Sequence, residues 1–595
     1  METEFKDRLI GDKKIPFKTM LKRSKKYIKR EVPSLIVSFA LIIINVLIDL
    51  IFPLITGYFT DNLQSSNIVL SSLLFLALGY FILTIVNQVI LYFESMTLQK
   101  AGQRIVYQLR MEVFTHIENM SQNQFNEMPV GSLVTRVANY TASMSDLFTS
   151  VLVNILRNVL TVVGVYCFML YISPLLSLIM LGLLFIVFIV TFFFKRIIAK
   201  FFKEEKGYIS DLNTFLNENL SGMKIIQLFN QQKRKDEEFS QKNENLRKSR
   251  FNITLAFAIY RPFIQLIYYC SIALTFYFGV VVLPDFGFII TAGNIVSFYL
   301  YLSRFFNPIQ QLADQLNDIQ KAISSCERLF NLLDVAPEVN DRADAIEVNT
   351  FKGKIEFKNV YFAYEKENWI LKDVSFTVAP GQTVAFVGAT GAGKTTILSL
   401  IVRNYEIQKG QILIDDIDIT HIKIECLRKA IGQMLQDVFL FSGTIRSNIT
   451  LHDDQYSDEE INEVCHYVNA DSFIALQEKG LDEEVIERGE NFSQGQRQLL
   501  SFARTVLHKP QILILDEATA NIDTETEVLI QESLDKIKNI GTMLVVAHRL
   551  STIQKADQII VLNHGEIIEK GTHQELLKNR GYYYKLYQLQ FANKH

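Results

Sequence analysis

The fold of this chain is decided by one stretch, Phe386-Val387-Gly388-Ala389-Thr390-Gly391-Ala392-Gly393-Lys394-Thr395-Thr396. It matches the pattern G-x-x-x-x-G-K-[ST]; a strand-like run precedes it at 383–387 and a helix-like run follows it at 397–401. Glycines let backbone N–H groups turn inward around an anion, and the helix N-terminus adds its dipole at the same place. In this setting the pattern predicts a loop that cradles nucleotide phosphates, rather than a chance match in a glycine-rich turn.

The residue types in the loop predict separate roles. We expect Lys394 to neutralise the β- and γ-phosphates and Thr395 to hold Mg²⁺. The expected nucleotide-binding set in this loop is Gly388, Ala389, Thr390, Gly391, Ala392, Gly393, Lys394, Thr395 and Thr396.

Length and composition predict a chain that is partly membrane-embedded and partly water-soluble. Its 595 residues are too many for one core, 49% of them are hydrophobic, and 44 are Phe. The net charge of -3 gives no indication of a nucleic-acid partner. The five cysteines are scattered and form no C-x-x-C pair, so neither a zinc site nor a disulfide framework is predicted.

Three intervals of the first half contain no Lys or Arg: 31–99, 158–194 and 262–303. Each holds enough apolar sequence for two membrane spans of about 20 residues. We therefore expect an all-α transmembrane domain at 31–332 with six spans, near 32–58, 67–94, 148–170, 174–197, 255–282 and 291–312.

The distribution of basic residues predicts the orientation of this domain. The short connections within each pair of spans carry no Lys or Arg, whereas the segments between pairs are rich in both. By the positive-inside rule, the short turns face outward, and both termini, the second domain and two long loops lie in the cytoplasm. The loops, about 95–147 and 198–254, keep helical spacing, so we expect the spans to continue past the bilayer. Breaks at 128–132 and 220–223 are either plain turns or contacts to the nucleotide domain.

The N-terminal segment 1–30 is basic, with lysines and arginines interleaved with apolar residues. This pattern predicts an amphipathic helix on the inner membrane surface, with a plain solvated helix as the alternative.

Polar residues inside a span need a reason, because a mid-membrane Asp costs about 2.5–3.5 kcal/mol on insertion scales. Asp49 lies well inside the first span, with Asn45 one turn before it. Two interpretations stay open for this pair: contact with a cationic or polar substrate, or packing against another helix.

The second half has a different pattern. A linker at 333–352 leads into alternating strand-like and helix-like segments, so we expect an α/β nucleotide-binding domain at 353–595. The apolar run 512–515 predicts a buried strand that ends in Asp516 and Glu517, an Mg²⁺ ligand and a general base. Three further residues follow strand-like runs and suit this chemistry: Tyr364 for adenine stacking, Gln436 for Mg²⁺ and His548 for the γ-phosphate.

The run Phe492-Ser493-Gln494-Gly495-Gln496-Arg497-Gln498 resembles the signature motif of ATP-binding cassette transporters, usually Leu-Ser-Gly-Gly-Gln. The resemblance covers nearly the whole chain and implies a half-transporter of the exporter type that uses ATP and Mg²⁺. It implies these roles: Tyr364 for adenine stacking; 388–396 as Walker A; Gln436 in the Q-loop; Asp516 and Glu517 as Walker B; 520–523 as the D-loop; His548 as the switch histidine; 487–490 as a loop that contacts the membrane domain; and 139–144 and 220–223 as two coupling helices.

In this family two nucleotide domains meet head to tail, so the resemblance implies a dimer. Ser493, Gln494, Gly495 and Gln496 would contact ATP held by the partner's Walker A. Ser493 can cap the following helix, which points the helix N-terminus at phosphate. Gln494 stands where the family usually has Gly, while Glu517 is intact, a combination that resembles one subunit of bacterial heterodimeric multidrug exporters. A heterodimer is therefore the favoured expectation, and a homodimer is the alternative.

These features predict ATP-driven export of hydrophobic or amphipathic compounds across the cell membrane by alternating access. Export of lipids or peptides by the same fold is the nearest alternative. A channel or regulator that binds ATP without pumping is disfavoured, because a pure binder needs no general base such as Glu517.

Overall fold

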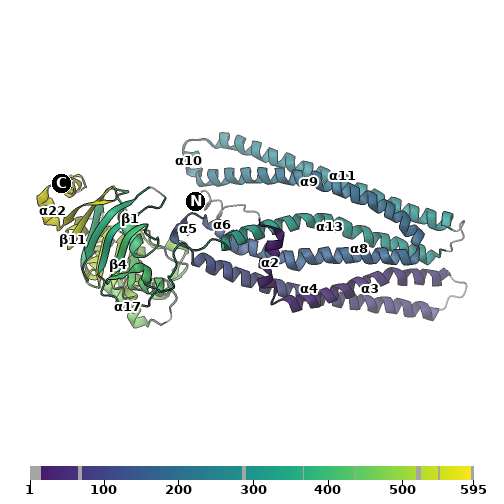
Figure 1. Cartoon of the computed structure of the whole chain (residues 1–595), viewed down its shortest axis with the longest axis horizontal. Helices are drawn as coiled ribbons and strands as arrows, with labels where there is room; N and C mark the ends of the chain where they lie inside the picture. The colour runs from purple at the N-terminus through teal and green to yellow at the C-terminus, as the bar shows by residue number, and fades with distance from the viewer. Residues whose placement is uncertain are drawn as a thin grey trace. The chain divides into compact units, whose positions relative to one another are not determined.

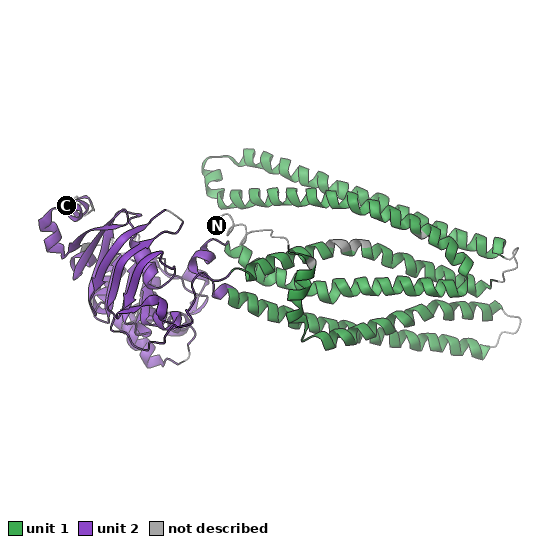
Figure 2. Cartoon of the chain, in the orientation of Figure 1, with its two compact units in different colours: residues 1–116, 129–335 green, residues 117–128, 336–595 purple. Residues whose placement is uncertain are grey.

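The structure is a computed structural model, and it describes residues 15–64, 70–283, 290–365, 368–435, 437–453, 455–516, 524–546 and 550–590. The chain divides into two compact units (Figure 2). Unit 1 comprises residues 1–116 and 129–335, and unit 2 comprises residues 117–128 and 336–595.

Unit 1 is entirely helical in its described part and is built on six long helical stretches (Figure 1). They are α3 (Val32–Gln64); α4 (Leu70–Glu118), which continues into unit 2; the run α6 (Val130–Thr135), η1 (Arg136–Tyr140), α7 (Thr141–Asp146), η2 (Leu147–Val151) and α8 (Leu152–Ile172); α9 (Pro174–Ser221); α11 (Gln232–Tyr277) with η3 (Phe278–Val282); and α13 (Ala292–Leu333). Each predicted span overlaps one of them. The helices also continue through most of 95–147 and 198–254, as the helical spacing of those loops predicted.

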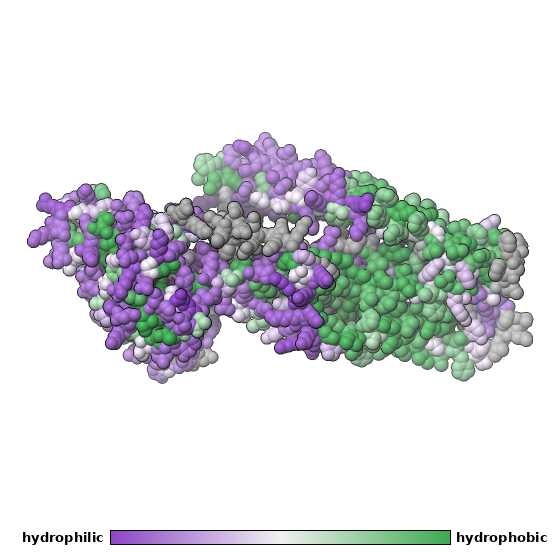
Figure 3. Space-filling model, in the orientation of Figure 1, coloured by the Kyte–Doolittle hydropathy of each residue, from purple (hydrophilic) through white to green (hydrophobic). Residues whose placement is uncertain are grey.

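Five of these stretches are long and apolar enough to cross a membrane: 32–64, 70–118, 130–172, 174–221 and 232–282. The sixth, α13, packs among them and buries Phe298, Tyr301 and Leu302. Figure 3 shows apolar side chains gathered over one part of the helical unit, while hydrophilic side chains cover the rest of its length. Apolar surface of this extent is stable in hydrocarbon and not in water, as expected for a transmembrane domain.

Close helix packing ties α3 to α13 near the end of α3. A Cβ added to Gly57 would lie 2.5 Å from the carbonyl oxygen of Gly293, and one added to Gly293 would lie 2.1 Å from that of Gly57. Only glycine allows the two backbones to approach this closely. Asp61 caps the start of α13 by accepting from the Gly293 N–H at 2.7 Å and from the Thr291 hydroxyl at 2.8 Å.

The basic N-terminal segment forms an amphipathic helix in its described part, α2 (Phe17–Ile28). Its inner face buries Met20, Ser24 and Tyr27. On its basic face, Arg23 pairs with Asp334 at 2.8 Å and Lys26 pairs with Glu112 at 2.9 Å. α2 therefore packs against the ends of α4 and α13, and its contact with a membrane surface stays a prediction.

The expected break at 128–132 is confirmed, because the chain leaves the helical path before Pro129 and α6 begins at Val130. The coupling helix expected at 139–144 is wrong. Residues 139–144 lie inside the continuous helical run of η1 and α7, so they do not form a separate coupling helix. The chain instead reverses around α5 (Gln122–Asn126), which the capping box of Ser121 and Gln124 starts. No Gly or Pro interrupts the chain from 132 to 163, so nothing there stops a helix. The second break is confirmed: α9 ends at Ser221, and α10 (Met223–Leu228) begins after Gly222.

Unit 2 is an α/β domain built on two main sheets. The six-stranded sheet has the order β12-β11-β3-β10-β9-β6, in which β6, β9, β10, β3 and β11 run parallel and β12 is antiparallel. The four-stranded antiparallel sheet has the order β2-β1-β4-β5, and β7 pairs with β8. The first strand of this sheet, β1, pairs with β2 in an irregular register.

The strands are β1 (Ile355–Phe362), β2 (Leu371–Val378), β3 (Thr383–Gly388), β4 (Lys409–Ile414), β5 (Ile417–Asp418), β6 (Ile431–Met434), β7 (Gly443–Thr444), β8 (Glu484–Val485), β9 (Ile512–Asp516), β10 (Thr542–Val546), β11 (Gln558–Asn563) and β12 (Glu566–Gly571). The helices are α14 (Lys394–Ile401), α15 (Ile424–Ala430), α16 (Ile445–Thr450), α17 (Asp458–Tyr467), α18 (Asp471–Ile474), α19 (Gln494–Leu507), α20 (Thr524–Ile537), α21 (Leu550–Gln554), α22 (His573–Asn579) and α23 (Tyr582–Gln590), with short 3₁₀ turns at Ile419–His421, Gly480–Asp482 and Glu487–Gly489. The central strands β3, β9 and β10 are nearly all buried, as expected for a parallel sheet covered on both faces.

Candidate functional site

The phosphate loop joins the carboxyl end of β3 to α14, as the sequence predicted. Gly393 has φ +100, a backbone conformation that disfavours any side chain, and a Cβ added there would lie 2.6 Å from Leu371 Cδ2. No side chain caps α14, so the first N–H groups of this helix are left to another acceptor. The loop therefore has the shape and the donors that a phosphate group needs.

Lys394 lies against the loop that carries it. Its side chain is buried, and its ammonium donates to the carbonyl oxygens of Gly388 at 2.8 Å and Ala389 at 3.1 Å. Burial lowers the pKa of Lys394, and the negative charge of Asp516 raises it in part. Because the charge of Asp516 acts on the pKa of Lys394, the carboxyl end of β9 and the phosphate loop belong to one site.

The strand register places the expected acidic residue beside the loop. Across β10, Val546 is the partner of both Phe386 in β3 and Asp516 in β9, so these residues lie at the same level of the sheet. Thr395 is exposed next to Lys394. One hydroxyl and one carboxylate, completed by phosphate oxygens, suit Mg²⁺, which usually keeps few protein ligands. Among the described residues, no three or more His, Cys, Asp or Glu lie together as a metal site, so phosphate oxygens would have to complete the coordination of Mg²⁺.

Three expected catalytic residues, Gln436, Glu517 and His548, lie outside the described residues, as does the expected D-loop at 520–523. The strands that precede them are described: β6 ends at Met434, β9 at Asp516 and β10 at Val546. Their catalytic roles stay predictions.

Tyr364 follows β1 and is 45% exposed. Its hydroxyl lies 3.1 Å from Thr396 Oγ1 in the phosphate loop, so the aromatic ring stands beside the loop. Its ring also packs edge-on against Phe362 and Tyr405, with centroids 4.9 and 5.1 Å away. This arrangement leaves an aromatic face available for a nucleotide base.

The turn at Phe492–Gln496 is built as a helix start. Ser493 caps α19: its hydroxyl accepts from the Gln496 N–H at 3.2 Å, and its own N–H donates to the Gln496 side chain at 2.9 Å. The predicted cap is confirmed. Gln494 and Gly495 form the first turn, and Phe492 is buried against Phe473, so an apolar residue other than Leu is accommodated there.

The end of α19 packs on the β6 side of the six-stranded sheet. Thr505, near the end of α19, contacts Gly432 in β6, which is separated from β3 by β9 and β10. Three strand spacings, about 14 Å, therefore separate this contact from the strand that leads into the phosphate loop.

In unit 1, Asp49 belongs to a polar network that joins three helices. Asn87 on α4 donates to Asp49 at 3.1 Å, Asn45 donates to Asn87 at 2.9 Å, and Arg304 on α13 lies 3.8 Å from Asp49. Asp49 and Arg304 are 44% and 33% exposed, so the network also keeps an accessible side. Interhelical packing therefore accounts for the charge of Asp49, and a substrate role for Asp49 and Asn45 stays a prediction.

A second membrane-embedded pair was missed from the sequence. Glu94 on α4 is nearly fully buried and pairs with Arg157 on α8. Removing Arg157 would leave the buried Glu94 carboxylate uncompensated, which is strongly destabilising. The sequence signals were weak: Glu94 ends the span predicted near 67–94, and Arg157 lies inside the span predicted near 148–170, directly before the interval without Lys or Arg.

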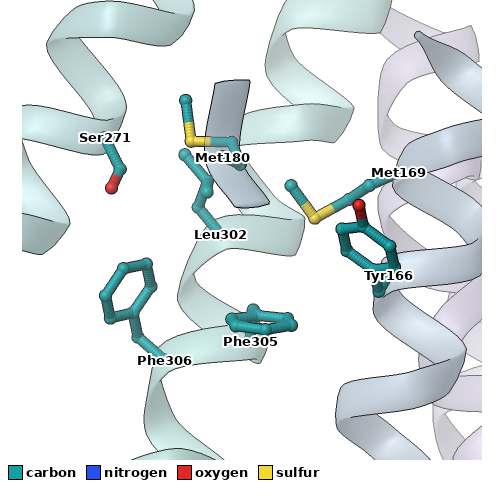
Figure 4. A pocket seen from close by; sticks show the side chains of 7 residues that line it. All are labelled: Tyr166, Met169, Met180, Ser271, Leu302, Phe305 and Phe306. Atoms are coloured by element: carbon teal, nitrogen blue, oxygen red, sulfur yellow. The ribbon is translucent and has the colours of Figure 1, made fainter. Parts of the chain in front are cut away.

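Two cavities in unit 1 differ sharply in size. The first, about 10 Å³, lies among α8, α9, α11 and α13 and is lined by two methionines and three aromatic rings (Figure 4). It has room for a water molecule and no organic compound. The second, about 500 Å³, lies between α9 and α11 and is lined almost entirely by apolar side chains, among them Phe193, Ile259 and Phe263. Its volume is in the range of small-molecule sites.

Unit 2 includes α5, a segment that the sequence analysis did not single out. Ser121, the N-cap of α5, and Asn123 donate to Glu338 at 3.1 and 3.4 Å, and Gln124 donates to the Ala336 carbonyl at 2.8 Å. The signal that could have located it is the S-x-x-Q spacing of Ser121 and Gln124.

Two family descriptions match the chain. Residues 35–309 match "ABC transporter transmembrane region", and residues 371–520 match "ABC transporter".

Individual proteins are similar over most of their length. A Bacillus subtilis ABC transporter protein, YheH, assigned by name to multidrug resistance, is 38% identical over 85% of this chain and 75% of its own. An ATP-dependent lipid A-core flippase of Syntrophus aciditrophicus is 36% identical over 84% of this chain and 83% of its own. The structure of a bacterial Atm1-family ABC exporter with ATP bound has a TM-score of 0.77 and 26% identity, covering 96% of this chain and 99% of that one.

Proposed function

The chain belongs to the ATP-binding cassette transporters, and from this premise we propose that it is one half of a multidrug exporter that works by alternating access. Transport coupled to ATP hydrolysis and the use of ATP with Mg²⁺ follow from the family. The finer assignments, namely the site residues, the partner, the orientation and the substrate class, are proposals. The observation that carries them is the phosphate loop next to Asp516 at one edge of the parallel sheet.

The proposed nucleotide site uses residues from both subunits of a dimer. In this chain, residues 388–396 hold the phosphates, Tyr364 stacks on adenine, and Thr395, Gln436 and Asp516 hold Mg²⁺. Glu517 takes the proton of the attacking water as general base, and His548 contacts the γ-phosphate. Mg²⁺, when bound, neutralises phosphate charge.

The proposed partner is a second half-transporter. Residues 493–496 form the capped start of α19, which the head-to-tail arrangement of this family would direct at ATP on another copy or subunit. The α10 turn gives independent support: Leu220, Ile225, Leu228 and Phe229 are all exposed around it. An exposed apolar cluster of this kind marks an interaction surface.

A heterodimer is favoured over a homodimer because of Gln494. In the head-to-tail arrangement, this side chain faces ATP on the partner's phosphate loop, whereas Glu517 serves the loop of its own chain. One altered and one intact site would then coexist in the same complex. Purification with and without a co-expressed partner tests this: a stable, active homodimer alone contradicts it.

Alternating access needs a large bias from ATP. To shift two conformations from about 1:99 to 99:1, ATP must favour the closed state by about 5.5 kcal/mol. Closing two nucleotide sites around charged ATP at once would supply this free energy, and hydrolysis at Glu517 then removes the bias toward the closed state.

The proposed substrates are hydrophobic or amphipathic compounds. The apolar cavity of about 500 Å³ between α9 and α11 supports this class. Named relatives act on different substrates, among them lipid A-core and drugs, so lipid export is the second candidate. Stimulation of ATPase activity by drugs but not by lipids would support the first, and the reverse result would support the second.

The protein is a multi-pass protein of the cell membrane. We propose that both termini and unit 2 lie in the cytoplasm, since Lys and Arg are concentrated in the segments between the pairs of spans. Protease cleavage of unit 2 in inside-out vesicles, but not in intact cells, tests this orientation.

A further inference from the structure

The face of α3 that carries Asp49 holds the groups that bind an organic cation. Asp49 and Phe52 are three residues apart, so they lie on the same face of this helix. The Phe52 ring packs against Tyr80 on α4, with centroids 4.8 Å apart and planes at 60°. A carboxylate beside aromatic rings attracts a cation twice, through the opposite charge and through the negative faces of the rings.

The structure already places a cation at this position, the side chain of Arg304 on α13. The guanidinium carbon of Arg304 lies 5.6 Å from the centroid of the Phe52 ring, and its Nη1 lies 3.8 Å from Asp49 Oδ1. Phe52 is only 6% exposed, so a ligand reaches the face of this ring only if Arg304 moves aside. Arg304 therefore occupies the place that an organic cation would take.

Arg304 is held loosely compared with the other membrane-embedded pair. Its distance of 3.8 Å from Asp49 is too long for a hydrogen bond, and Arg304 donates no hydrogen bond within the described residues. Asp49 accepts a single hydrogen bond, from Asn87 at 3.1 Å, although a carboxylate can accept about four. Glu94 and Arg157, by contrast, are in direct contact. The Arg304 side chain can therefore leave Asp49 without breaking a hydrogen bond.

The backbones on either side of this contact are fixed, so only the side chain has to move. On α13, the Tyr301 hydroxyl donates to the carbonyl of Leu50, and the Ser297 hydroxyl donates to the carbonyl of Pro53 at 2.9 Å. These two bonds hold α13 against the turn of α3 that carries the carboxylate and the ring. Displacement of Arg304 then requires rotation of its own side chain and no separation of the helices.

We propose that Arg304 is a tethered cation that covers a substrate site made by Asp49, Phe52 and Tyr80, and that amphipathic compounds with one positive charge bind by displacing it. This names the substrate class of the proposed exporter and rests on that function. Asp49 lies near the middle of α3 (Val32–Gln64), whereas lipid headgroups lie at the two membrane surfaces. The site therefore favours a drug-like cation over the headgroup of a resident lipid.

The experiment measures the Kd of two probes of nearly the same shape and opposite charge, tetraphenylphosphonium and tetraphenylborate, by equilibrium dialysis. The protein is the full complex with its partner subunit in nanodiscs. The variants are Arg304→Gln, Arg304→Lys and the double variant Asp49→Asn/Arg304→Gln. Arg261→Gln is the matched control, because Arg261 also lies over a ring, Phe257 at 5.3 Å, but pairs with no carboxylate in the described part of the chain.

The displacement model predicts that Arg304→Gln binds tetraphenylphosphonium about 2- to 30-fold more tightly, the factor that one cation–π contact contributes. Tetraphenylborate should not gain, and Arg304→Lys and Arg261→Gln should stay within about 2-fold of the unmodified complex. The double variant should bind the cation at least about 2-fold more weakly than Arg304→Gln, because it lacks the carboxylate. It also leaves no unpaired charge, so it keeps the test valid if Arg304→Gln alone does not fold.

Three results would overturn the proposal. The first is a Kd for tetraphenylphosphonium in Arg304→Gln that stays within 2-fold of the unmodified value. The second is equal tightening of both probes, which would mean that the substitution only widens the site. The third is displacement of tetraphenylphosphonium by a soluble short-chain phosphatidylcholine, which would assign the site to a lipid headgroup.

ATP-driven uptake of a neutral hydrophobic dye separates this proposal from the proposed function. If the unmodified complex moves no dye with ATP, export is wrong, whatever Arg304→Gln does to the Kd of the cation. If the neutral dye is transported and that Kd does not respond to Arg304→Gln, export stands and the cation site alone is wrong.

Discussion

Replacement of Lys394 by Met tests the phosphate site most sharply, because it keeps the apolar stem and removes the charge. The ammonium of Lys394 is buried and already points at the loop carbonyls of Gly388 and Ala389, so it needs little movement to meet a phosphate. A hydrogen bond to a charged group contributes about 1.5–3 kcal/mol, and opposite charges 4 Å apart attract by about 4 kcal/mol at an effective dielectric constant of 20. These magnitudes predict a loss of about 10- to 10³-fold in ATPase rate.

The assay is ATP hydrolysis by the reconstituted complex, with the thermal unfolding midpoint measured on the same samples. Lys536→Met is the matched control, because Lys536 is another partly buried lysine in unit 2 whose ammonium donates to an uncharged oxygen, Asn469 Oδ1 at 2.9 Å. Both variants should lose similar stability, and only Lys394→Met should lose activity. If the two variants lose activity equally, or Lys394→Met stays within 3-fold of the unmodified rate, the reasoning about the phosphate loop is wrong.

Three further predictions address the base, the partner and the membrane network. Glu517→Gln should bind ATP and remain in the closed state because no base removes the proton of water; single-turnover hydrolysis at the unmodified rate would exclude it as the base. Ser493→Ala should cost about 1 kcal/mol of stability, as should the matched variant Ser457→Ala, because Ser457 starts α17 with the same kind of capping box. In a heterodimer the Ser493 change should lower ATPase by less than 3-fold, whereas a loss of about 10- to 150-fold would indicate that Ser493 completes the active site, as in a homodimer. Asp49→Asn leaves the charge of Arg304 unpaired, so efflux of a cationic dye should fall more than that of a neutral dye; equal efflux of both would exclude a substrate role.

The membrane helices and the parallel sheet could be predicted because their signals are local. Long intervals without Lys or Arg mark the spans. The apolar runs that form β3, β9 and β10 each lead directly into a polar or glycine-rich segment. The capping by Ser493 was predictable for the same reason, since the cap and its partner Gln496 are three residues apart.

Contacts between distant parts of the sequence could not be predicted. Asp49 on α3 is paired with Arg304 on α13, and no residue near Asp49 in the sequence indicates that Arg304 is its partner. The pair of Glu94 and Arg157 is hidden in the same way, because Glu94 alone reads as the charged end of its span and nothing near it in the sequence indicates Arg157 as its partner.

The coupling helix expected at 139–144 failed for a different reason. The family resemblance suggested this position, but residues 139–144 lie inside a continuous helical run, and the helix stop and start signals lie earlier, where α4 ends at Glu118 and the capping box of Ser121 opens α5. Local capping chemistry was the better guide to the turn than the family resemblance.

The central claim is that ATP hydrolysis by the assembled complex drives a compound across a sealed membrane. The most direct measurement is the accumulation of a hydrophobic fluorescent dye inside inside-out vesicles that contain this chain and its partner. The account predicts uptake against a concentration gradient with ATP and Mg²⁺, and none with Lys394→Met or after Mg²⁺ is removed. Hydrolysis of ATP at full rate without any dye, lipid or peptide being moved would contradict it.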